Sequence, residues 1–570
     1  MKPLPIGIEN FKELIDRQYY FVDKSDLISD LANEKIVIYT RPRRFGKTLT
    51  MSMLYYFFSV CERDNAYLFE HLKITEYPEI MQFQNQYPVI FISMKDLKNR
   101  TYEMQIRMFS LLIQEIAMKF SFLTESDSLI EIEKKRLDKL LYENANESEL
   151  QLAIKFLTQC LCHHFHKKVI LLIDEYDVPL QSAYLHGYYD KMVIFLGNVF
   201  SSSLKTNDYL EKGILTGCLR IARESIFTGL NNFSVYSALD ETASSCFGFT
   251  QDEVNDLLST YQLSAYSNQV KSWYNGYLFG NTEIYNPWSV LKYVNKLLTS
   301  EDKSPSTFWG NTSSNDIVYQ YIQQADQQMK SEFEELIKGK SIVKHIKQDL
   351  TYRDMDDIQN IYSFMLMTGY LKAIGKEGTD HQICLPNLEV HEIFKNTFVR
   401  YFQNFISARR NDFVHCLKHH DVNQAQSLLN QMLYHSLSYF DNHENFYHVF
   451  LVGLLQGYHI KPNREAGDGR FDLVIYGETI DDPCIVIECK HSETMRSLKA
   501  DSEKAARQII DKRYIDEILD EGYLQCIGYG IAFCKKSCLI DYISFFSYLM
   551  RCIGNALYNA FSLFFSFTCV

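Results

Sequence analysis

Two separate clusters of residues in this 570-residue chain have the types and spacing needed for phosphate chemistry. The first is Gly46-Lys47-Thr48, which follows the apolar run 36–39 and precedes an apolar and aromatic segment. At a helix N-terminus, such a lysine can reach the β- and γ-phosphates of a nucleotide, and the threonine hydroxyl can ligate Mg²⁺. We therefore expect main-chain N–H groups and side chains to surround ATP phosphates at Arg43, Arg44, Phe45, Gly46, Lys47, Thr48 and Leu49.

The first position of this loop departs from the usual pattern. Arg41 stands where a phosphate-binding loop ordinarily opens with glycine, which permits a tight turn. Because Gly-Lys-Thr alone arises by chance in many proteins, the interpretation depends on the neighbouring elements. A buried strand before the loop, a helix after it and a later strand that ends in acids together indicate a nucleotide site.

That later strand is the apolar run 169–173, which ends in Asp174-Glu175. Beside a phosphate loop, Asp174 would hold Mg²⁺ and its water shell, and Glu175 would polarise the attacking water. The alternative is a strand that simply ends in solvated acids.

Three further polar residues follow in the next candidate strand and beyond it. Thr216, at the end of the run 213–217, could contact the γ-phosphate or the attacking water. Arg220 and Arg223 could sense the γ-phosphate, and a surface salt bridge is an equally good interpretation of either arginine.

The second cluster lies near the C-terminus and consists of Asp472 and Glu488-Cys489-Lys490. Side chains two residues apart on a strand share a face, so Glu488 and Lys490 should point the same way. A hairpin would bring Asp472 alongside, which gives two carboxylates and the Cys489 carbonyl as Mg²⁺ ligands. Lys490 would orient or help to deprotonate a water that attacks a phosphodiester. Since Glu-x-Lys is common on exposed strands, the interpretation of this pattern as a nuclease site also depends on the neighbouring elements.

The elements around these residues predict a multidomain α/β protein. Apolar strands at 36–39, 88–93, 169–173 and 213–217 alternate with helices, which favours an open parallel sheet covered by helices on both faces. Helices dominate the middle of the chain, and a small α/β unit follows. We expect a nucleotide-binding domain at 1–255, a helical middle region at 256–430, the small unit at 431–540 and an apolar tail at 541–570.

At this point the chain resembles a known family, the bacterial AAA-ATPase-like proteins that carry a C-terminal PD-(D/E)xK nuclease-superfamily domain. The resemblance rests on the glycine-poor loop and on several further motifs, which span roughly residues 4–538. These motifs are 20–25 (YFVDKS), 172–177 (LIDEYD), 216–221 (TGCLRI), 273–277 (WYNGY), 285–289 (YNPWS) and 368–371 (TGYL). The resemblance implies a P-loop ATPase domain and a restriction-endonuclease-like domain, and it makes Arg41 a feature of the family.

Within the C-terminal cluster, the resemblance adds further residues. Gly467 to Asp472 is similar to the approach to the motif acid in this superfamily, and Gln508 with Tyr514 resembles the glutamine motif of a subset of its nucleases. Glu444 could supply another acid. Because this fold also serves for binding after its metal site decays, recognition without cleavage stays an alternative.

The composition limits which partners the protein could bind and which cellular compartment it could occupy. A net charge of −13 argues against a protein that coats nucleic acid through its overall field, so any DNA contact must be a local surface or a metal-neutralised site. Fourteen cysteines without a C-x-x-C pair, and no signal peptide, favour a reducing cytoplasm, and the resemblance implies a bacterial one. A homo-oligomer is an open alternative.

The tail from 542 to 570 contains a single charge, Arg551, and is long enough to cross a bilayer. Arg551, Asn555 and Asn559 interrupt it near its middle, so we do not expect membrane contact. A membrane anchor, a core-packed helix and an out-of-frame extension remain the three interpretations of this segment.

The leading hypothesis is an ATPase that is coupled to a Mg²⁺-dependent DNA nuclease. The alternative is a nucleotide-gated switch whose nuclease-like domain recognises a partner and does not cut.

Overall fold

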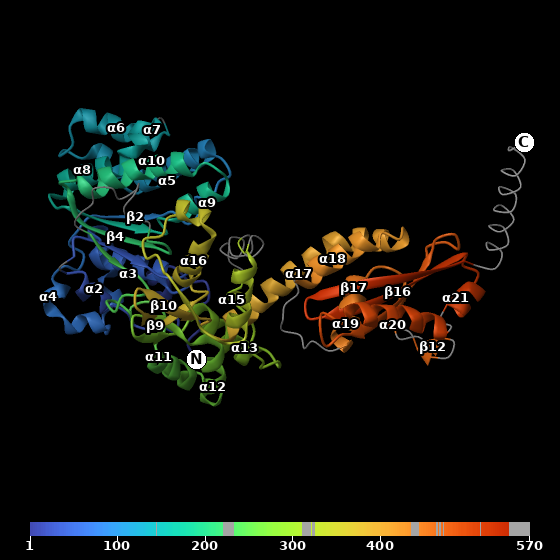
Figure 1. The fold of residues 1–570 in the computed structure, drawn as a ribbon. Helices are drawn as coiled ribbons and strands as arrows, with labels where there is room; N and C mark the ends of the chain where they lie inside the picture. Colours follow the sequence, from blue (N-terminus) through green and yellow to red (C-terminus); the bar gives the residue numbers. More distant parts are fainter. Residues whose placement is uncertain are drawn as a thin grey trace, which may run out of the picture. The chain divides into compact units, whose positions relative to one another are not determined.

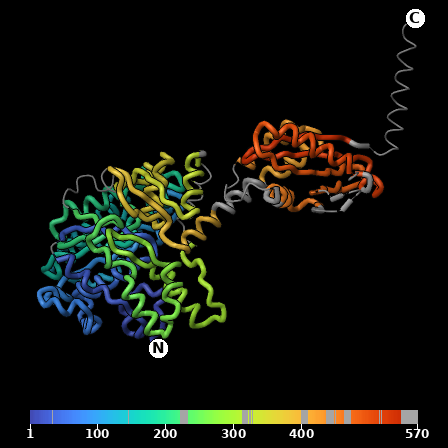
Figure 2. The backbone as a smooth tube through the Cα atoms, turned by 60° about the horizontal axis from the view of Figure 1, so that its bottom comes forward, coloured from blue at the N-terminus to red at the C-terminus, as the bar shows by residue number. Residues whose placement is uncertain are grey.

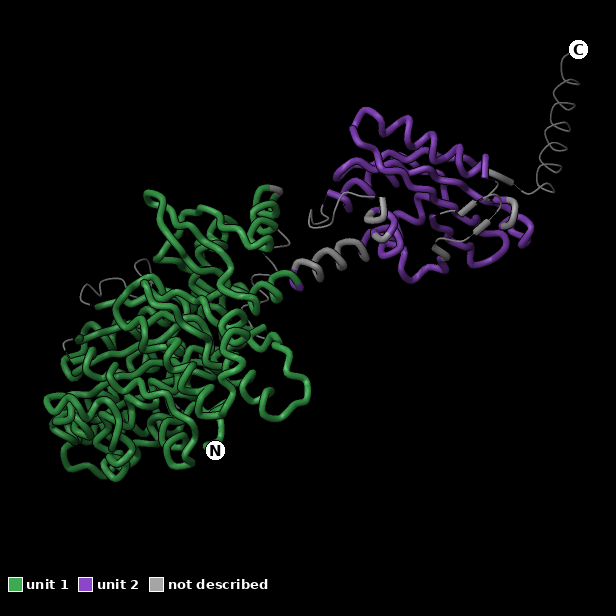
Figure 3. Tube along the Cα trace, turned by 90° about the horizontal axis from the view of Figure 1, so that it is seen from below, with its two compact units in different colours: residues 1–395 green, residues 396–570 purple. Residues whose placement is uncertain are grey.

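The computed structural model describes residues 1–546 apart from 33, 144, 221–232, 311–320, 322–324, 435–443, 463–464, 467–468, 471 and 513–514. The chain divides into two compact units, residues 1–395 and residues 396–570 (Figure 3). Each unit contains one of the two clusters that the sequence predicts to do phosphate chemistry.

The first unit is built on a parallel sheet, as the sequence predicts, and the sheet has a fifth strand, β5, that the sequence analysis did not predict. The strand order is β2-β3-β4-β1-β5, and every neighbouring pair is parallel. Figure 1 shows α5, α8 and α10 on one side of this sheet and α3 on the other. The strands are β1 (Ile36–Thr40), β2 (Val89–Ser93), β3 (Val169–Asp174), β4 (Leu210–Gly217) and β5 (Ser234–Tyr236).

The helices of this layer follow from apolar stripes and from local caps. The side chain of Thr101, for example, accepts the N–H of Met104 and so starts α5. The helices are α1 (Phe11–Asp16), α2 (Leu27–Asp30), α3 (Lys47–Phe58), α4 (Pro78–Met81), α5 (Tyr102–Lys119), α6 (Glu131–Leu141), α7 (Glu147–Gln151), α8 (Ala153–Phe165), α9 (Val178–Leu185) and α10 (Tyr189–Phe200).

The middle of the chain differs from the expected helical region, because it contains two small antiparallel sheets. One has the order β8-β10-β9, and the other is the hairpin β6-β7. The strands are β6 (Tyr277–Phe279), β7 (Thr282–Ile284), β8 (Ile342–Lys344), β9 (Lys372–Glu377) and β10 (Asp380–Cys384). The helices are α11 (Gln251–Thr260), α12 (Ser267–Tyr274), α13 (Pro287–Thr299), α15 (Gln327–Ile337), α16 (Ile361–Thr368) and α17 (Leu388–Lys418). The sequence missed these strands because they are short and carry no long apolar run.

The compact units also divide the chain differently from the domain boundaries we predict at 255, 430 and 540. Residues 256–395 belong to the first unit. The helix α17 begins in the first unit and ends in the second.

The second unit has a mixed sheet with the order β11-β14-β15-β16-β17, in which only the β15–β16 pair is parallel. It forms the orange-to-red part of the trace in Figure 2. Its strands are β11 (Ile460–Pro462), β12 (Glu465–Ala466), β13 (Gly469–Arg470), β14 (Leu473–Ile475), β15 (Cys484–His491), β16 (Gln525–Cys534) and β17 (Ser537–Phe546). Its further helices are α18 (Val422–Tyr434), α19 (Glu444–Leu454), α20 (Leu498–Asp511) and α21 (Asp516–Asp520).

The two faces of this sheet have separate cores. Alternate residues of β15, such as Ile485 and Ile487, pack with α17, α18 and α19, whereas Val486 packs with Ile509 of α20. The strand period of two therefore decides which side chains of β15 reach α20.

The apolar tail that we expect from residue 541 begins as a strand. Residues 541–546 form the end of β17, which pairs with β16, and 547–570 lie outside the described residues. In the part of the chain that the structure describes, no helix is both long enough and apolar enough to cross a bilayer.

Candidate nucleotide and phosphodiester sites

The glycine-poor loop between β1 and α3 turns at two positions other than Arg41. Arg44 and Gly46 have φ values of +68° and +88°, so the left-handed turns fall there. Arg41 keeps a negative φ, and its fully buried guanidinium donates to the carbonyls of Tyr236 at 2.8 Å and Ala243 at 3.1 Å. The arginine therefore fastens the loop to the body of the first unit, and no glycine is required at its position.

Lys47 occupies the centre of this loop. Its buried Nζ donates to the carbonyls of Arg41 at 3.1 Å and Pro42 at 3.0 Å. Burial lowers the pKa of Lys47, but the neighbouring Cys218 and the acids that include Glu175 raise it by more, so the net pKa is raised. The ammonium group therefore stays charged where an anion would bind.

Asp174 joins three elements at the carboxyl edge of the sheet. Its two oxygens accept the hydroxyl of Thr48 at 2.7 Å and the hydroxyl of Thr216 at 2.6 Å. Burial raises the pKa of Asp174, and the two hydroxyl donors oppose that rise. The parallel register puts β3 beside β4, and β4 beside β1, so residues far apart in sequence meet here.

Glu175 follows Asp174 with φ +54°, an uncommon value for a residue other than glycine. It lines the cavity described below. Nearby, buried Asp177 accepts the N–H groups of Cys218 at 2.9 Å and Leu219 at 3.1 Å, which fixes the segment after β4.

Of the two arginines that the sequence suggests as γ-phosphate sensors, the structure describes one. Arg220 forms an ion pair with Asp349 at 2.7 Å, which corresponds to the salt-bridge interpretation. Arg223 lies outside the described residues.

A cavity of about 610 Å³ opens over the loop. The loop residues 43–49 and Glu175 line it, together with residues that the sequence analysis did not assign to a site. Those residues come from the N-terminal lead, from α3, from the segment after β2, from 246–249 and from α13, and they include Tyr20, Phe21, Lys95, Lys98 and Trp288. The rule that ligands bind at the carboxyl edge of a parallel sheet could have drawn attention to Lys95 and Lys98.

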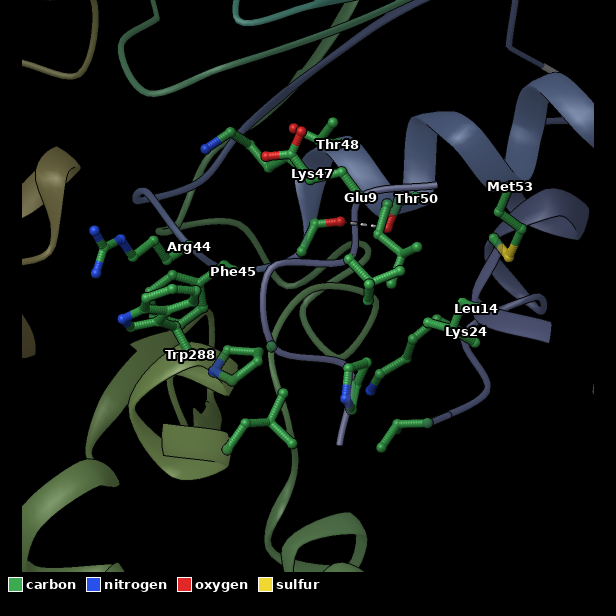
Figure 4. A pocket seen from close by; sticks show the side chains of 18 of the residues that line it. Glu9, Leu14, Lys24, Arg44, Phe45, Lys47, Thr48, Thr50, Met53 and Trp288 are labelled. Atoms are coloured by element: carbon green, nitrogen blue, oxygen red, sulfur yellow. Dashed lines mark hydrogen bonds between the residues drawn. The ribbon is translucent and has the colours of Figure 1, made fainter. Parts of the chain in front are cut away.

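Figure 4 shows Arg44, Phe45 and Trp288 together on one side of this cavity, and Leu14, Lys24 and Met53 on another. The guanidinium carbon of Arg44 lies 4.4 Å from the centre of the Trp288 ring. The sequence analysis did not assign Trp288 to a site, but the indole lines the cavity.

The other loop side chains serve to hold the loop. Arg43 donates to Oε1 of Gln181 at 2.5 Å. Phe45 is buried against Tyr277, with ring centroids 5.0 Å apart. Leu49 follows on the first turn of α3 and lines the cavity.

In the second unit, Glu488 lies on the face of the sheet that α20 covers, and Asp472 is hydrogen-bonded to the main chain of the next residue, Cys489. Glu488 is 3% exposed and accepts a hydrogen bond from the amide of Gln508, and Nζ of Lys490 lies 3.7 Å from its carboxylate. Oδ2 of Asp472 accepts the main-chain N–H of Cys489 at 2.8 Å. This hydrogen bond joins the two halves of the sequence pattern across neighbouring strands.

The Cys489 side chain is 1% exposed and points into the opposite core, so only its backbone belongs to the site. His448 of α19 makes a hydrogen bond of 2.8 Å to the carbonyl of Asp472, a contact that no sequence motif indicated. Tyr514, Gly467, Asp468 and the side chain of Glu444 lie outside the described residues.

Both sites present hard oxygen ligands, which Mg²⁺ prefers. The first offers the Thr48 hydroxyl and Asp174, and the second offers Asp472, Glu488 and the Cys489 carbonyl. Among the described side chains, no group of three or more His, Cys, Asp or Glu residues could hold a metal ion. A magnesium ion at either site would therefore keep several water ligands.

Comparison with known proteins agrees with this division. Residues 5–227 match the family model described as Predicted AAA-ATPase, and residues 442–542 match the PD-(D/E)XK nuclease superfamily. A protein of Azotobacter chroococcum mcd 1, described as "Uncharacterized protein in vnfD 5'region", is 25% identical over 307 residues. The match covers 52% of each chain, so this chain spans about half the length of that curated relative.

The chain thus carries an AAA-ATPase-like domain in its N-terminal part and a PD-(D/E)XK nuclease-superfamily domain near its C-terminus, as the sequence predicts.

Proposed function

We propose that the first unit binds and hydrolyses ATP and that the second unit is a Mg²⁺-dependent DNA nuclease under the control of that ATPase. The observation that carries the nuclease assignment is the pair of carboxylates, Asp472 directly before β14 and Glu488 on the neighbouring β15, with Lys490 beside Glu488. The ATPase assignment is supported by the Thr48–Asp174–Thr216 contacts at the edge of a cavity that fits a small ligand.

In the first unit, the loop residues 43–49 hold the phosphates, and Lys47 neutralises charge that develops on them. Thr48 and Asp174 hold Mg²⁺, and Thr216 keeps the Asp174 carboxylate oriented. Glu175, which lines the cavity, positions the attacking water.

In the second unit, Asp472, Glu488 and the Cys489 carbonyl hold Mg²⁺. The ion supplies charge neutralisation and lowers the pKa of a water ligand. Lys490 would orient that water and stabilise the negative charge that develops on it, while Gln508 fixes the Glu488 carboxylate. Since the whole chain carries a charge of −13, DNA must approach through this local, metal-neutralised site.

The test is cleavage of supercoiled and linear DNA by the full chain with Mg²⁺, in the presence and absence of ATP. We expect wild type to cut, Glu488→Ala to lose cleavage, and the exposed-residue control Glu493→Ala to keep it. ATP should change the rate in wild type but not in Lys47→Ala. Equal cleavage by wild type and Glu488→Ala would refute the nuclease assignment.

A second function is favoured by one feature of the C-terminal site. Glu488 is already engaged by Gln508 and lies near Lys490, and the described side chains supply only two acids to the metal. Such a site suits a nucleotide-gated module that recognises DNA or a protein and does not cut. ATP hydrolysis with no cleavage by wild type under any condition would support this alternative.

A further inference from the structure

A short series of contacts connects the phosphate loop with the first turn of α17. Nη1 of Arg44 donates to the carbonyl of Phe308 at 3.0 Å. The N–H groups of Phe308 and Trp309 in turn donate to Oε1 of Glu389 at 2.7 and 3.0 Å. The indole N–H of Trp309 also contacts the carbonyl of Arg43 at 3.4 Å. Arg43 and Arg44 of the loop are therefore both tied to residues 308 and 309.

The end of this series is a buried carboxyl group. Glu389, the second residue of α17, is 0% exposed. Burial raises the pKa of Glu389 to about 7, and the two N–H donors, the Ser289 side chain and the charge of Arg44 oppose that rise. A buried carboxylate is costly unless donors and a cation surround it, so its position depends on these few contacts.

The other end of the series lies in the candidate nucleotide site. Arg44 lines the cavity and rests on Trp288, which lines it as well. An incoming nucleotide brings several negative charges beside the guanidinium. These charges would compete with the Phe308 carbonyl and with Glu389 for Arg44.

The helix that carries Glu389 also belongs to the second unit. It runs from Leu388 to Lys418, and its residues Phe413, Val414 and Leu417 lie in the core that contains β15. A conformational change in the first turn of α17 therefore occurs in a helix whose C-terminal part belongs to the core of the nuclease-superfamily unit.

We propose that Arg44 responds to nucleotide phosphates and that Glu389 is the positioning residue that passes this response through Phe308 and Trp309 to α17. The inference rests on the proposed nucleotide site. When phosphates draw Arg44 away, the Phe308 and Trp309 N–H bonds to Glu389 weaken, and the first turn of α17 loosens.

The test is hydrogen–deuterium exchange of the full chain with and without Mg²⁺ and the non-hydrolysable nucleotide AMP-PNP. In wild type, we expect nucleotide to accelerate exchange in peptides that cover 306–310 and 387–395. In Glu389→Gln the acceleration should be lost, while nucleotide affinity stays near the wild-type value because Glu389 does not line the cavity. Glu133→Gln, a similarly buried glutamate on α6 that binds Gln159, is the matched control and should keep the response.

The outcomes separate this inference from the proposed function. Failure of wild type to bind AMP-PNP would refute the nucleotide site and the inference with it. Binding without a change in exchange, or an acceleration that persists in Glu389→Gln, would refute the connection alone. If Glu389→Gln fails to fold, Arg44→Gln at saturating nucleotide tests the same connection from its partly exposed end, and a persisting acceleration would again refute it.

Discussion

The buried carboxylate of Glu389 should make the stability of the first unit depend on pH. Burial raises its pKa from 4.5 to about 7, against the opposing effect of the Phe308 and Trp309 N–H groups and of Arg44. The folded protein therefore keeps this proton to a higher pH than the unfolded chain does. By linkage, stability falls as pH rises from 4.5 towards 7, because the folded state then binds more protons than the unfolded state.

The size of this loss follows from the two pKa values. Each pKa unit corresponds to about 1.4 kcal/mol, so ionisation of Glu389 should cost the fold about 3 kcal/mol by pH 8. Glu389→Gln cannot ionise, and its amide oxygen can still accept the same two N–H groups. The variant should thus lack this part of the pH dependence, with the greatest gain relative to wild type above pH 7.

The assay is urea unfolding followed by tryptophan fluorescence between pH 5 and 8.5. All three tryptophans, Trp273, Trp288 and Trp309, lie in the first unit, so the signal reports on that unit. The stability difference between wild type and Glu389→Gln isolates the contribution of this carboxyl group from those of other titrating residues. A difference that stays constant with pH would refute the reasoning.

Three other predictions follow from packing and hydrogen bonds. Arg41→Gly, which restores the usual loop glycine, should lower the stability of the first unit by about 3 kcal/mol in urea unfolding, because the hydrogen bonds of a buried guanidinium are lost. It should not raise ATP affinity in a binding titration, because residue 41 has no left-handed backbone conformation that glycine would relieve. Gly530→Ala should destabilise the second unit by about 3 kcal/mol in thermal unfolding, because a Cβ there would overlap the α20 backbone; Gly453→Ala, which has open space, should not. Gln508→Ala should lower DNA cleavage about 10-fold to 100-fold in the plasmid assay, and an unchanged rate would exclude a role in orienting Glu488.

The sequence alone determined those strands and side-chain directions that follow from patterns among neighbouring residues. Continuous apolar runs such as 169–173 become the buried parallel strands, because both faces of such a strand are covered by helices. The period of two on a strand also placed Glu488 and Lys490 on the same face, which is the face that α20 covers. These conclusions needed only backbone geometry and solvent exclusion.

Only the tertiary structure decided the contacts between distant segments. The sequence could not show that Arg41 satisfies carbonyls two hundred residues away, nor that Trp288 lines the same cavity as Lys47, since no periodicity links such positions. The short strands of the middle region were missed for a related reason, because they are held by cross-strand pairing more than by a long apolar pattern of their own. The position of Glu389 beside the phosphate loop is likewise a product of packing, because burial gives an ordinary glutamate its raised pKa against the opposing charge of the nearby arginine.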